Sequence, residues 1–231
     1  MSRQAFFVTG TDTGIGKTYA ACALLRVAAA GGLSTLGLKP VAAGCEETGE
    51  GLRNEDALAL MAASTVSLPY AQVNPFALRA ALAPHVAAAQ ENRRLRTAQV
   101  TGLVRGALMQ GRADFTLVEG AGGWRVPLNE QETLADVARE LALPVLLVVG
   151  LRLGCINHAL LTAEAVRHDG LRLAGWIANA IDPQMAARQE SVDTLRERIG
   201  APLLGVLPFG AAGELGLPLS PGPSPRGGEG G

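Results

Sequence analysis

The chain has 231 residues, a formal net charge of −1 and a hydrophobic fraction of 48%. This length suits one large domain with a full core. The hydrophobic fraction excludes a mainly disordered chain. The balanced charge argues against a nucleic-acid binder, which usually has a surplus of basic residues. Its 29 glycines and 13 prolines make up roughly 18% of the residues against about 12% in average proteins, so the glycines need an explanation.

The predicted elements alternate between short apolar strands and amphipathic helices. Apolar runs predict strands over residues 6–8, 36–38, 115–118, 145–149, 173–178 and 202–207. Apolar positions at helical spacing predict helices over residues 17–30, 56–63, 97–110, 133–141, 156–168 and 185–199. This order predicts an α/β fold with a doubly wound, mostly parallel sheet flanked by helices. Ligands in such folds bind beyond the carboxyl ends of the strands, so the residues that follow each strand matter most.

Two segments fall outside this alternation. Three prolines and an arginine cluster in residues 64–96 predict an irregular insertion between helices. From 218 to 231, nine of 14 residues are glycine or proline, a composition that cannot build a core. We therefore expect a single domain over residues 1–217 and a disordered low-complexity tail over residues 218–231.

Cysteine usage and apolar runs indicate the compartment. Cys22, Cys45 and Cys155 form neither a CxxC pair nor an even set, which argues against a zinc ribbon or a disulfide scaffold and fits a reducing compartment. The N-terminus has no apolar signal-peptide region. The longest apolar run, residues 141–151, is too short to span a bilayer. We expect a cytoplasmic protein without membrane attachment.

The first predicted strand is followed by a phosphate-binding motif. Residues 10–18 read G-T-D-T-G-I-G-K-T and match G-x-x-x-x-G-K-[ST] between a strand and a helix, which is the context that this motif requires. The backbone N–H groups of such a loop bind phosphate together with the following helix N-terminus. Lys17 is expected to reach the β- and γ-phosphates, and the Thr18 hydroxyl to bind magnesium. The motif predicts nucleotide binding in a fold of the P-loop NTPase type.

Lysine is rare in this chain, which suggests that the retained lysines have specific contacts. Of 20 basic residues, 18 are arginine, and the two lysines are Lys17 and Lys39. A compact ammonium is not interchangeable with a planar guanidinium. Lys39 follows the second predicted strand and so lies at the same sheet edge as the phosphate loop; the alternative is an ordinary surface lysine.

Two carboxylates are candidate magnesium ligands. Glu119 ends a predicted strand and is followed by the glycine-rich stretch 120–123. A carboxylate facing a phosphate loop is a usual magnesium partner, and glycines let a ligand approach the backbone closely. The alternative is a turn with a surface glutamate. Asp56 precedes an apolar run, and from the residues alone it is equally well explained as a helix-start acid that interacts with the helix dipole.

Two later positions are weaker candidates. The segment 153–158 opens a helix whose free N–H groups suit a carboxylate; alternatively, Asn157 or His158 simply caps the helix. Asn179 ends a predicted strand, where it either reads an adenine edge or starts a turn. His85 and His168 show no partner pattern and are interpreted as structural or solvated residues.

Taken together, several stretches resemble the dethiobiotin synthetase family, the ATP-dependent ring-closing enzymes of biotin synthesis. The matching stretches are 8–13 with 16–18, 39–42, 51–54 with 56–58, 118–124, 153–159, 174–176 with 178–179, and 203–205. The phosphate loop alone is shared with many ATPases, whereas the Lys-Pro, Glu-Gly-Ala-Gly-Gly and Gly-Cys-Ile-Asn-His segments are far more specific. The resemblance covers roughly residues 5–210.

The resemblance implies a reaction and a site. In this family 7,8-diaminopelargonate takes up CO₂ as a carbamate, ATP phosphorylates the carbamate, and the second amine closes the ring to give dethiobiotin, ADP and phosphate.

The resemblance also implies the site residues. Lys17 and Lys39 are the implied catalytic residues, and Thr18, Asp56 and Glu119 are the implied Mg²⁺ ligands. The implied ATP contacts are Thr13, Gly14, Ile15, Gly16, Lys17, Thr18, Tyr19, Asp56, Glu119, Gly120, Ala121, Gly122, Asn179, Pro208 and Phe209. The implied substrate contacts are Lys39, Ala43, Gly120, Ala121, Gly122, Gly123, Gly154, Cys155, Ile156 and Asn157. The residues from Gly154 onward come from the partner subunit in this family, which implies a homodimer with composite sites.

The chain departs from the family pattern at three places. Ala43 stands where the family usually has Ser or Thr near the carbamate. Ala180 follows Asn179 where an acid is common, and the tail replaces the family's C-terminal helical region. Two other classes of protein fit the sequence less well. A cobyrinate-type amidating synthase needs a glutaminase domain, for which this chain is too short. A partition-type switch ATPase needs a lysine where the chain has Thr11.

Overall fold

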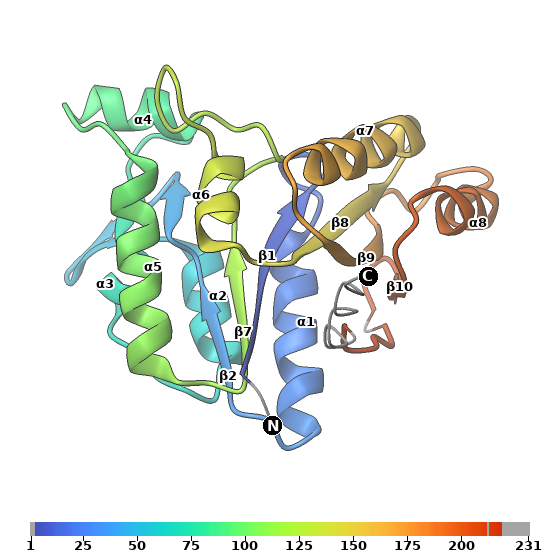
Figure 1. Ribbon diagram of the computed structural model, residues 1–231, viewed down its shortest axis with the longest axis horizontal. Coiled ribbons are helices and arrows are strands. Elements are labelled where there is room, and N and C mark those ends of the chain that lie inside the picture. Colours follow the sequence, from blue (N-terminus) through green and yellow to red (C-terminus); the bar gives the residue numbers. More distant parts are fainter. Residues whose placement is uncertain (1–2, 212, 219–231) are drawn as a thin grey trace, which may run out of the picture.

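A six-stranded sheet forms the centre of the computed structural model, which describes residues 3–211 and 213–218 (Figure 1). The strand order is β10-β9-β8-β1-β7-β2, and every pairing in this sheet is parallel. The strands are β1 (Gln4–Gly10), β2 (Thr35–Leu38), β7 (Phe115–Glu119), β8 (Val145–Leu151), β9 (Leu173–Ala180) and β10 (Leu203–Leu207). The predicted doubly wound α/β fold is confirmed.

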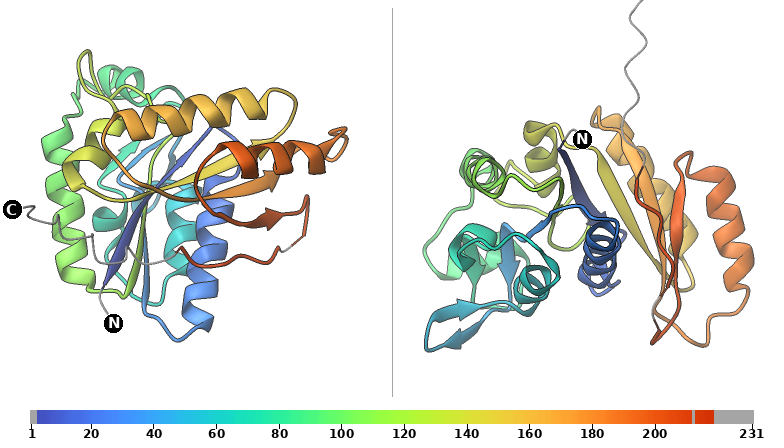
Figure 2. Two further views of the ribbon diagram at one scale, coloured as in Figure 1. Left: turned by 45° about the vertical axis from the view of Figure 1, so that its right-hand side comes forward. Right: turned by 90° about the horizontal axis from the view of Figure 1, so that it is seen from below.

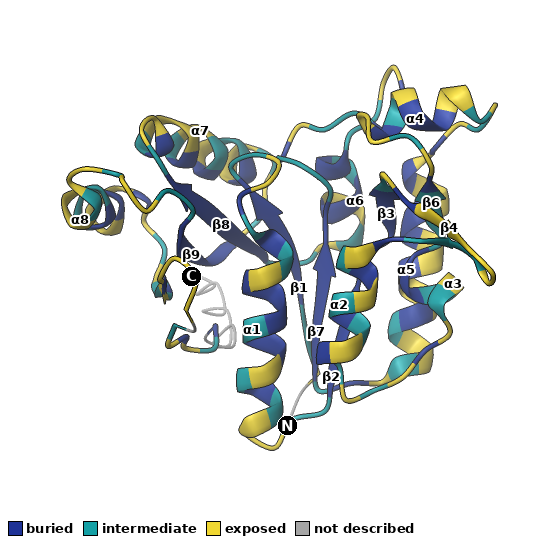
Figure 3. Ribbon diagram, turned by 180° about the vertical axis from the view of Figure 1, so that it is seen from behind, coloured by how far each residue is buried: buried dark blue, intermediate teal, exposed yellow. Residues whose placement is uncertain are grey.

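Helices cover both faces of the sheet and form two cores. These helices are α1 (Lys17–Ala30), α2 (Glu55–Ala63), α5 (Thr97–Gly111), α6 (Leu134–Leu141), α7 (Cys155–His168) and α8 (Arg188–Arg198). On one face, α5, α6, α7 and α8 bury their apolar sides in one cluster; on the other, α1 and α2 do so (Figure 3). Because both faces are covered, the strands read as continuous apolar runs.

The position of the phosphate loop follows from the strand order. The chain runs from β1 to β2 on one side, and later returns to β8 on the other side of β1. The loop after β1 therefore leaves the sheet at the point where the winding direction reverses, and ligands of doubly wound sheets bind at this point.

Residues 64–96 are more regular than the sequence predicts. This segment contains α3 (Tyr70–Val73), β6 (Phe76–Leu78) and α4 (Pro84–Gln90). Its strand β6 pairs in parallel with β3 (Val41–Ala43), and a hairpin of β4 (Glu46–Thr48) and β5 (Gly51–Arg53) projects nearby (Figure 2). The prediction of an irregular insertion is wrong because elements of three to seven residues are too short to show a clear periodicity and because β6 pairs with a strand more than 30 residues away in the chain.

The C-terminal prediction is only partly covered by the structure. Leu215 and Leu217 pack on the core beside α1, and Gly216 N donates a hydrogen bond to Leu204 O at 2.7 Å. Pro218, the first residue of the predicted tail, is buried. The remaining tail residues, 219–231, lie outside the described residues.

Candidate active site

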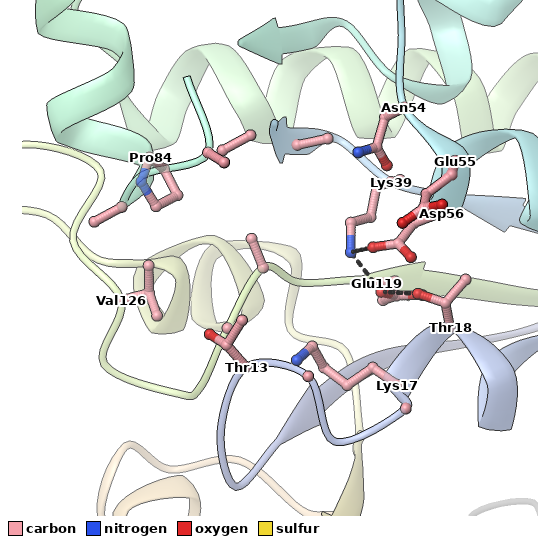
Figure 4. Close-up of a pocket in the computed structure, with 18 of the residues that line it drawn as sticks. Thr13, Lys17, Thr18, Lys39, Asn54, Glu55, Asp56, Pro84, Glu119 and Val126 are labelled. Carbon is pink, nitrogen blue, oxygen red and sulfur yellow. Dashed lines mark hydrogen bonds and ion pairs between the residues drawn. The ribbon is translucent and has the colours of Figure 1, made fainter. Parts of the chain in front are cut away.

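A cavity of about 800 Å³ opens at the carboxyl ends of β1, β2 and β7 (Figure 4). Its walls come from the phosphate loop, the turn after β2 with strand β3, the start of α2, the segment that leads into α4 and the turn after β7. It is lined by Thr13, Gly14, Gly16, Lys17, Thr18, Tyr19, Lys39, Ala42, Ala43, Asn54, Glu55, Asp56, Ala81, Leu82, Ala83, Pro84, Glu119, Ala121, Gly122 and Val126. A volume of this size fits two small-molecule ligands side by side or one large one.

The phosphate loop is fixed by contacts on its side that faces the core and strand β9. Ile15 is 1% exposed and packs into the core with α1, while Asn179 Nδ2 at the end of β9 donates a hydrogen bond to Ile15 O at 2.8 Å. Gly16 has φ +81°, and a Cβ there would lie 2.1 Å from Asn179 Nδ2. Only glycine combines this left-handed backbone with so close a neighbour. The loop therefore turns tightly enough to open α1 with its N–H groups toward the cavity.

Lys17 ends this loop, and its ammonium is hydrogen-bonded to a backbone oxygen of the loop. Its Nζ donates to Asp12 O at 2.9 Å. Burial, and next the nearby charge of Lys39, lowers the pKa of the Lys17 ammonium from 10.5 to about 8. An anion placed in the loop would reverse this shift, because it favours the charged form.

Lys39 is buried between two carboxylates. It is 4% exposed, and its Nζ lies 2.5 Å from Glu119 Oε1 and 2.9 Å from Asp56 Oδ2 (Figure 4). Burial alone would lower the pKa of Lys39, but the two carboxylates outweigh it and raise the pKa above 10.5. Lys39 therefore carries a fixed positive charge at the cavity wall.

Three oxygen-bearing side chains near Lys39 suit a hard divalent cation. The Thr18 hydroxyl donates to Glu119 Oε1 at 2.9 Å, and Asp56 reaches Lys39 from α2. Glu119 is fully buried, and its Oε2 has no hydrogen-bond partner among the described residues. A buried carboxylate oxygen without a partner is costly unless a cation or donor occupies the space beside it. Two carboxylates and a hydroxyl, completed by phosphate oxygens and water, fit Mg²⁺.

This donor set is smaller than a self-sufficient metal site. Within the described residues there is no group of three or more His, Cys, Asp or Glu arranged to hold a metal ion. Mg²⁺ is usually bound by one or two carboxylates together with substrate phosphates, and Asp56 and Glu119 supply two carboxylates here.

The structure brings twelve of the sequence-derived site residues together at the cavity. They are Thr13, Gly14, Gly16, Lys17, Thr18, Tyr19, Lys39, Ala43, Asp56, Glu119, Ala121 and Gly122. Asp56, which the residues alone explain equally well as a helix-start acid, lies in the first turn of α2 and also pairs with Lys39.

The other sequence-derived site residues lie outside the cavity lining. Ile15 is in the core, Gly120 and Gly123 flank lining residues, and Asn179 is 6% exposed behind the phosphate loop. Pro208 and Phe209 are exposed just after β10. Gly154, Cys155, Ile156 and Asn157 open α7 but do not line the cavity of this single chain.

Several lining residues were not assigned from the sequence. Asn54 caps α2 by accepting a hydrogen bond from Ala57 N at 3.2 Å, and its preference for helix starts is a usable sequence signal. Residues 81–83 and Val126 carry no such signal, because apolar side chains in loops have no distinctive pattern, whereas Pro84 begins α4, a position that proline favours.

Across residues 3–211 and 213–218, no helix is both long and apolar enough to cross a membrane. This agrees with the short apolar runs of the sequence.

Comparisons with known proteins give a consistent result. A family model described as "AAA domain" matches residues 4–212. The chain is 62% identical over 208 residues to a Cellvibrio japonicus protein named ATP-dependent dethiobiotin synthetase BioD, covering 90% of each chain. Proteins of the same name from Marinobacter nauticus and Yersinia pestis are 56% and 51% identical, covering 90% and 89% of this chain and 89% and 85% of theirs.

Among solved structures, similarity is limited to the fold. The MinC:MinD cell division protein complex of Aquifex aeolicus matches with a TM-score of 0.55 at 19% identity, covering 89% of this chain and 81% of that one. Chloroplast FtsY from Physcomitrella patens matches with a TM-score of 0.53 at 18% identity, covering 95% and 63%. Both support the P-loop type of α/β fold.

Proposed function

This chain belongs to the ATP-dependent dethiobiotin synthetase family, within the broader AAA-domain family, and on that premise we propose how its cavity carries out the reaction. The enzyme forms dethiobiotin in biotin biosynthesis at the expense of ATP. The observation that carries the proposal is the buried Lys39 ammonium, held by Glu119 and Asp56 directly across the cavity from the phosphate loop (Figure 4).

The phosphate loop and Lys17 would bind the triphosphate of ATP. The N–H groups at the start of α1 favour anions, and Lys17 would exchange its bond to Asp12 O for phosphate oxygens. Thr18, Asp56 and Glu119 would hold Mg²⁺, which when bound neutralises charge on the transferred phosphoryl group. Asp56 is 40% exposed at its side chain, so it can approach a ligand without leaving a buried position.

The diamine would lie on the Lys39 side of the cavity. One amine of 7,8-diaminopelargonate adds to CO₂ and releases a proton, giving a carbamate. A carbamate oxygen attacks the γ-phosphorus of ATP, and ADP leaves. The second amine then attacks the carbonyl carbon and releases a proton, phosphate leaves, and the ring is closed. Lys39 would hold the carbamate and its transferred phosphoryl group through charge, without giving up its proton, since the two carboxylates keep it charged.

Ala43 leaves this side of the cavity without a hydroxyl where relatives usually have one. It lines the cavity directly after Ala42. We infer that Lys39 and nearby backbone donors orient the carbamate in this chain.

We further propose a homodimer in the cytoplasm, with a single domain over residues 1–217. Segment 154–157 lies outside the cavity of its own chain, yet its N–H groups at the start of α7 suit the distal carboxylate of the diamine. A partner subunit would place this segment at the cavity. The exposed Leu153 and Leu161 on and beside α7 give an apolar surface for such a contact.

The test is direct product detection. Purified protein is mixed with Mg-ATP, ¹³C-bicarbonate and 7,8-diaminopelargonate, and dethiobiotin carrying one ¹³C atom is sought by mass spectrometry. We expect labelled dethiobiotin in equal amount to the ADP released. ADP release that does not depend on the diamine would overturn the proposal and favour a switch ATPase.

A further inference from the structure

A hydrogen-bonded pair outside the cavity connects the two sides of the site. Tyr70 and Asn74 lie in and after α3, within the segment predicted to be an irregular insertion. Neither residue lines the cavity, and neither belongs to the site residues derived from the sequence. Their contacts nonetheless end on the backbones of two cavity residues.

The first of these backbones is that of Lys39. Lys39 N donates to Val73 O at 3.0 Å, and Lys39 O accepts a hydrogen bond from Asn74 Nδ2 at 2.5 Å. Asn74 is 2% exposed, so its amide is fixed by burial as well as by bonding. Phe76 N, at the start of β6, donates to Pro40 O at 3.1 Å. The segment around Asn74 therefore holds both peptide groups from which the Lys39 side chain extends.

The second backbone is that of Asn54, at the start of α2. The Tyr70 hydroxyl donates to Asn74 Oδ1 at 3.0 Å and accepts a hydrogen bond from Asn54 N at 2.7 Å. Asn54 caps α2, and Asp56 lies in the first turn of that helix. One hydroxyl thus connects the start of the helix that carries Asp56 to the amide that holds Lys39.

We propose that Tyr70 and Asn74 are positioning residues that fix Lys39 and Asp56 relative to each other for the reaction. The two charged residues come from separate elements, the turn after β2 and the helix α2, and their side chains meet at 2.9 Å. An ion pair with a partly exposed member does not hold its own geometry well, so a buried hydrogen-bond network behind it is needed to do so. This inference rests on the proposed roles of Lys39 and Asp56.

The phenol ring allows the hydroxyl to be tested separately from the fold. The Arg53 guanidinium lies over the Tyr70 ring, 4.2 Å from its centroid. Tyr70→Phe keeps this stacking and the packing of the ring, but it removes the bridge between Asn54 N and Asn74 Oδ1. Ser34→Ala is a matched control, since the Ser34 hydroxyl also donates one bond, to Asp114 Oδ2, and accepts one, from Asp114 N, at a position far from the cavity.

The experiment compares kcat, the KM for ATP and the Mg²⁺ concentration that gives half-maximal rate. For Tyr70→Phe we expect kcat to fall roughly 10- to 100-fold and the Mg²⁺ requirement to rise, the usual effect of losing a bond behind a metal ligand. The KM for ATP is expected to change less than about twofold, since the phosphate loop belongs to other elements. Ser34→Ala is expected to lower the melting temperature while keeping kcat and the Mg²⁺ requirement unchanged.

A double variant tests whether the two residues act through one connection. If they do, the kcat of the double variant Tyr70→Phe, Asn74→Ala is close to that of the less active single variant. A fold-loss in kcat equal to the product of the two single fold-losses would overturn the inference. Wild-type kcat and Mg²⁺ requirement in Tyr70→Phe would overturn it as well. Absence of dethiobiotin from the wild type itself would instead overturn the proposed function, and the inference with it.

Discussion

The space around the Lys39 ammonium fits a small cation and not a planar one. Its Nζ is within 2.9 Å of both Asp56 and Glu119, and the residue is 4% exposed in a chain that otherwise uses arginine for 18 of 20 basic positions. We expect Lys39→Arg to keep ATP affinity but to lose kcat by roughly 100-fold or more, because the guanidinium cannot occupy the position of the ammonium. Calorimetry gives the affinity, and dethiobiotin formation gives kcat.

Arg26→Lys is the control for this substitution. It makes the opposite change on the exposed side of α1, outside the cavity lining, and is expected to leave both quantities unchanged. Turnover of Lys39→Arg close to the wild-type value would show that Lys39 is not needed as an ammonium.

Lys17 makes ATP affinity depend on pH. Its pKa is lowered to about 8 in the free protein, chiefly by burial. Bound phosphates favour the ammonium and raise this pKa, so the complex holds more protons than the free protein at a pH above about 8. Affinity is therefore constant below this pH and falls as the pH rises above it, by at most about tenfold per unit.

Calorimetry at pH 8.5 in buffers of different ionisation enthalpy checks the sign, since ATP binding is expected to take up protons. Lys17→Arg is the control, because a guanidinium stays charged over this range and should show no such uptake. Proton release on binding to the wild type, or an affinity that is constant up to pH 9.5, would contradict the assignment.

At the scale of elements, the sequence predicts those whose signals are local. The strand β7 is a short run of residues that favour strands, Phe-Thr-Leu-Val, and ends in Glu119, while α1 follows a complete phosphate-loop motif, so both appear where expected. The pairing of β6 with β3 and the hydrogen bonds of Tyr70 with Asn54 and of Asn74 with Lys39 are different, since they join residues that are 16 to 35 positions apart. No periodic pattern encodes such contacts. Asp56 is the clearest case: its role is undecided until the fold brings Lys39 beside it.

The connection between β9 and the phosphate loop gives a test at this scale. Asn179 Nδ2 donates to Ile15 O at 2.8 Å, which supports a role in holding the loop rather than in reading adenine. We expect Asn179→Ala to raise the KM for ATP roughly tenfold, the cost of one buried hydrogen bond. The KM for GTP should rise by the same factor, because the phosphates of both nucleotides bind the same loop.

Asn129→Ala is the matched control, as Asn129 Nδ2 also donates to a backbone oxygen, that of Leu95, at 2.8 Å and is buried away from the cavity. It should lower the melting temperature without changing either KM. A change in the preference for ATP over GTP in Asn179→Ala would show instead that Asn179 contacts the base.

At the scale of the whole molecule, two truncations separate the tail from the core. Ending the chain after Pro218 removes only residues outside the described part, and kcat and melting temperature are expected to stay unchanged. Ending it after Ala211 also removes Leu215 and Leu217, which pack beside α1, and the bond from Gly216 N to Leu204 O. Loss of a buried leucine costs about 1.5–3 kcal/mol, which lowers the melting temperature by roughly 5–10 °C in a chain of this size.

Differential scanning fluorimetry measures both truncations against the full chain. A drop in melting temperature or kcat for the chain ending at Pro218 would show that residues 219–231 contribute to the folded protein. An unchanged melting temperature for the chain ending at Ala211 would contradict the packing of Leu215.

The proposed composite site predicts that two inactive chains restore each other. Lys39→Ala removes the ammonium from the cavity but leaves α7 intact. Gly154→Val distorts the start of α7, because Gly154 has φ +94°, a backbone conformation that β-branched residues rarely adopt, and no neighbour lies within 4 Å of the added Cβ. A dimer of one chain of each kind then has one intact site, built from the cavity of the Gly154→Val chain and α7 of the Lys39→Ala chain.

Co-expression of the two variants in equal amounts gives mixed dimers as half of the total, so about a quarter of the wild-type activity is expected to return. Co-expression of Lys39→Ala with Lys17→Ala is the control, because both changes affect the same half of the site and every dimer keeps two damaged cavities. If the first pair is no more active than its separate members while sedimentation shows dimers, each chain completes its own site, and the exposed start of α7 serves some purpose other than binding the diamine of its partner.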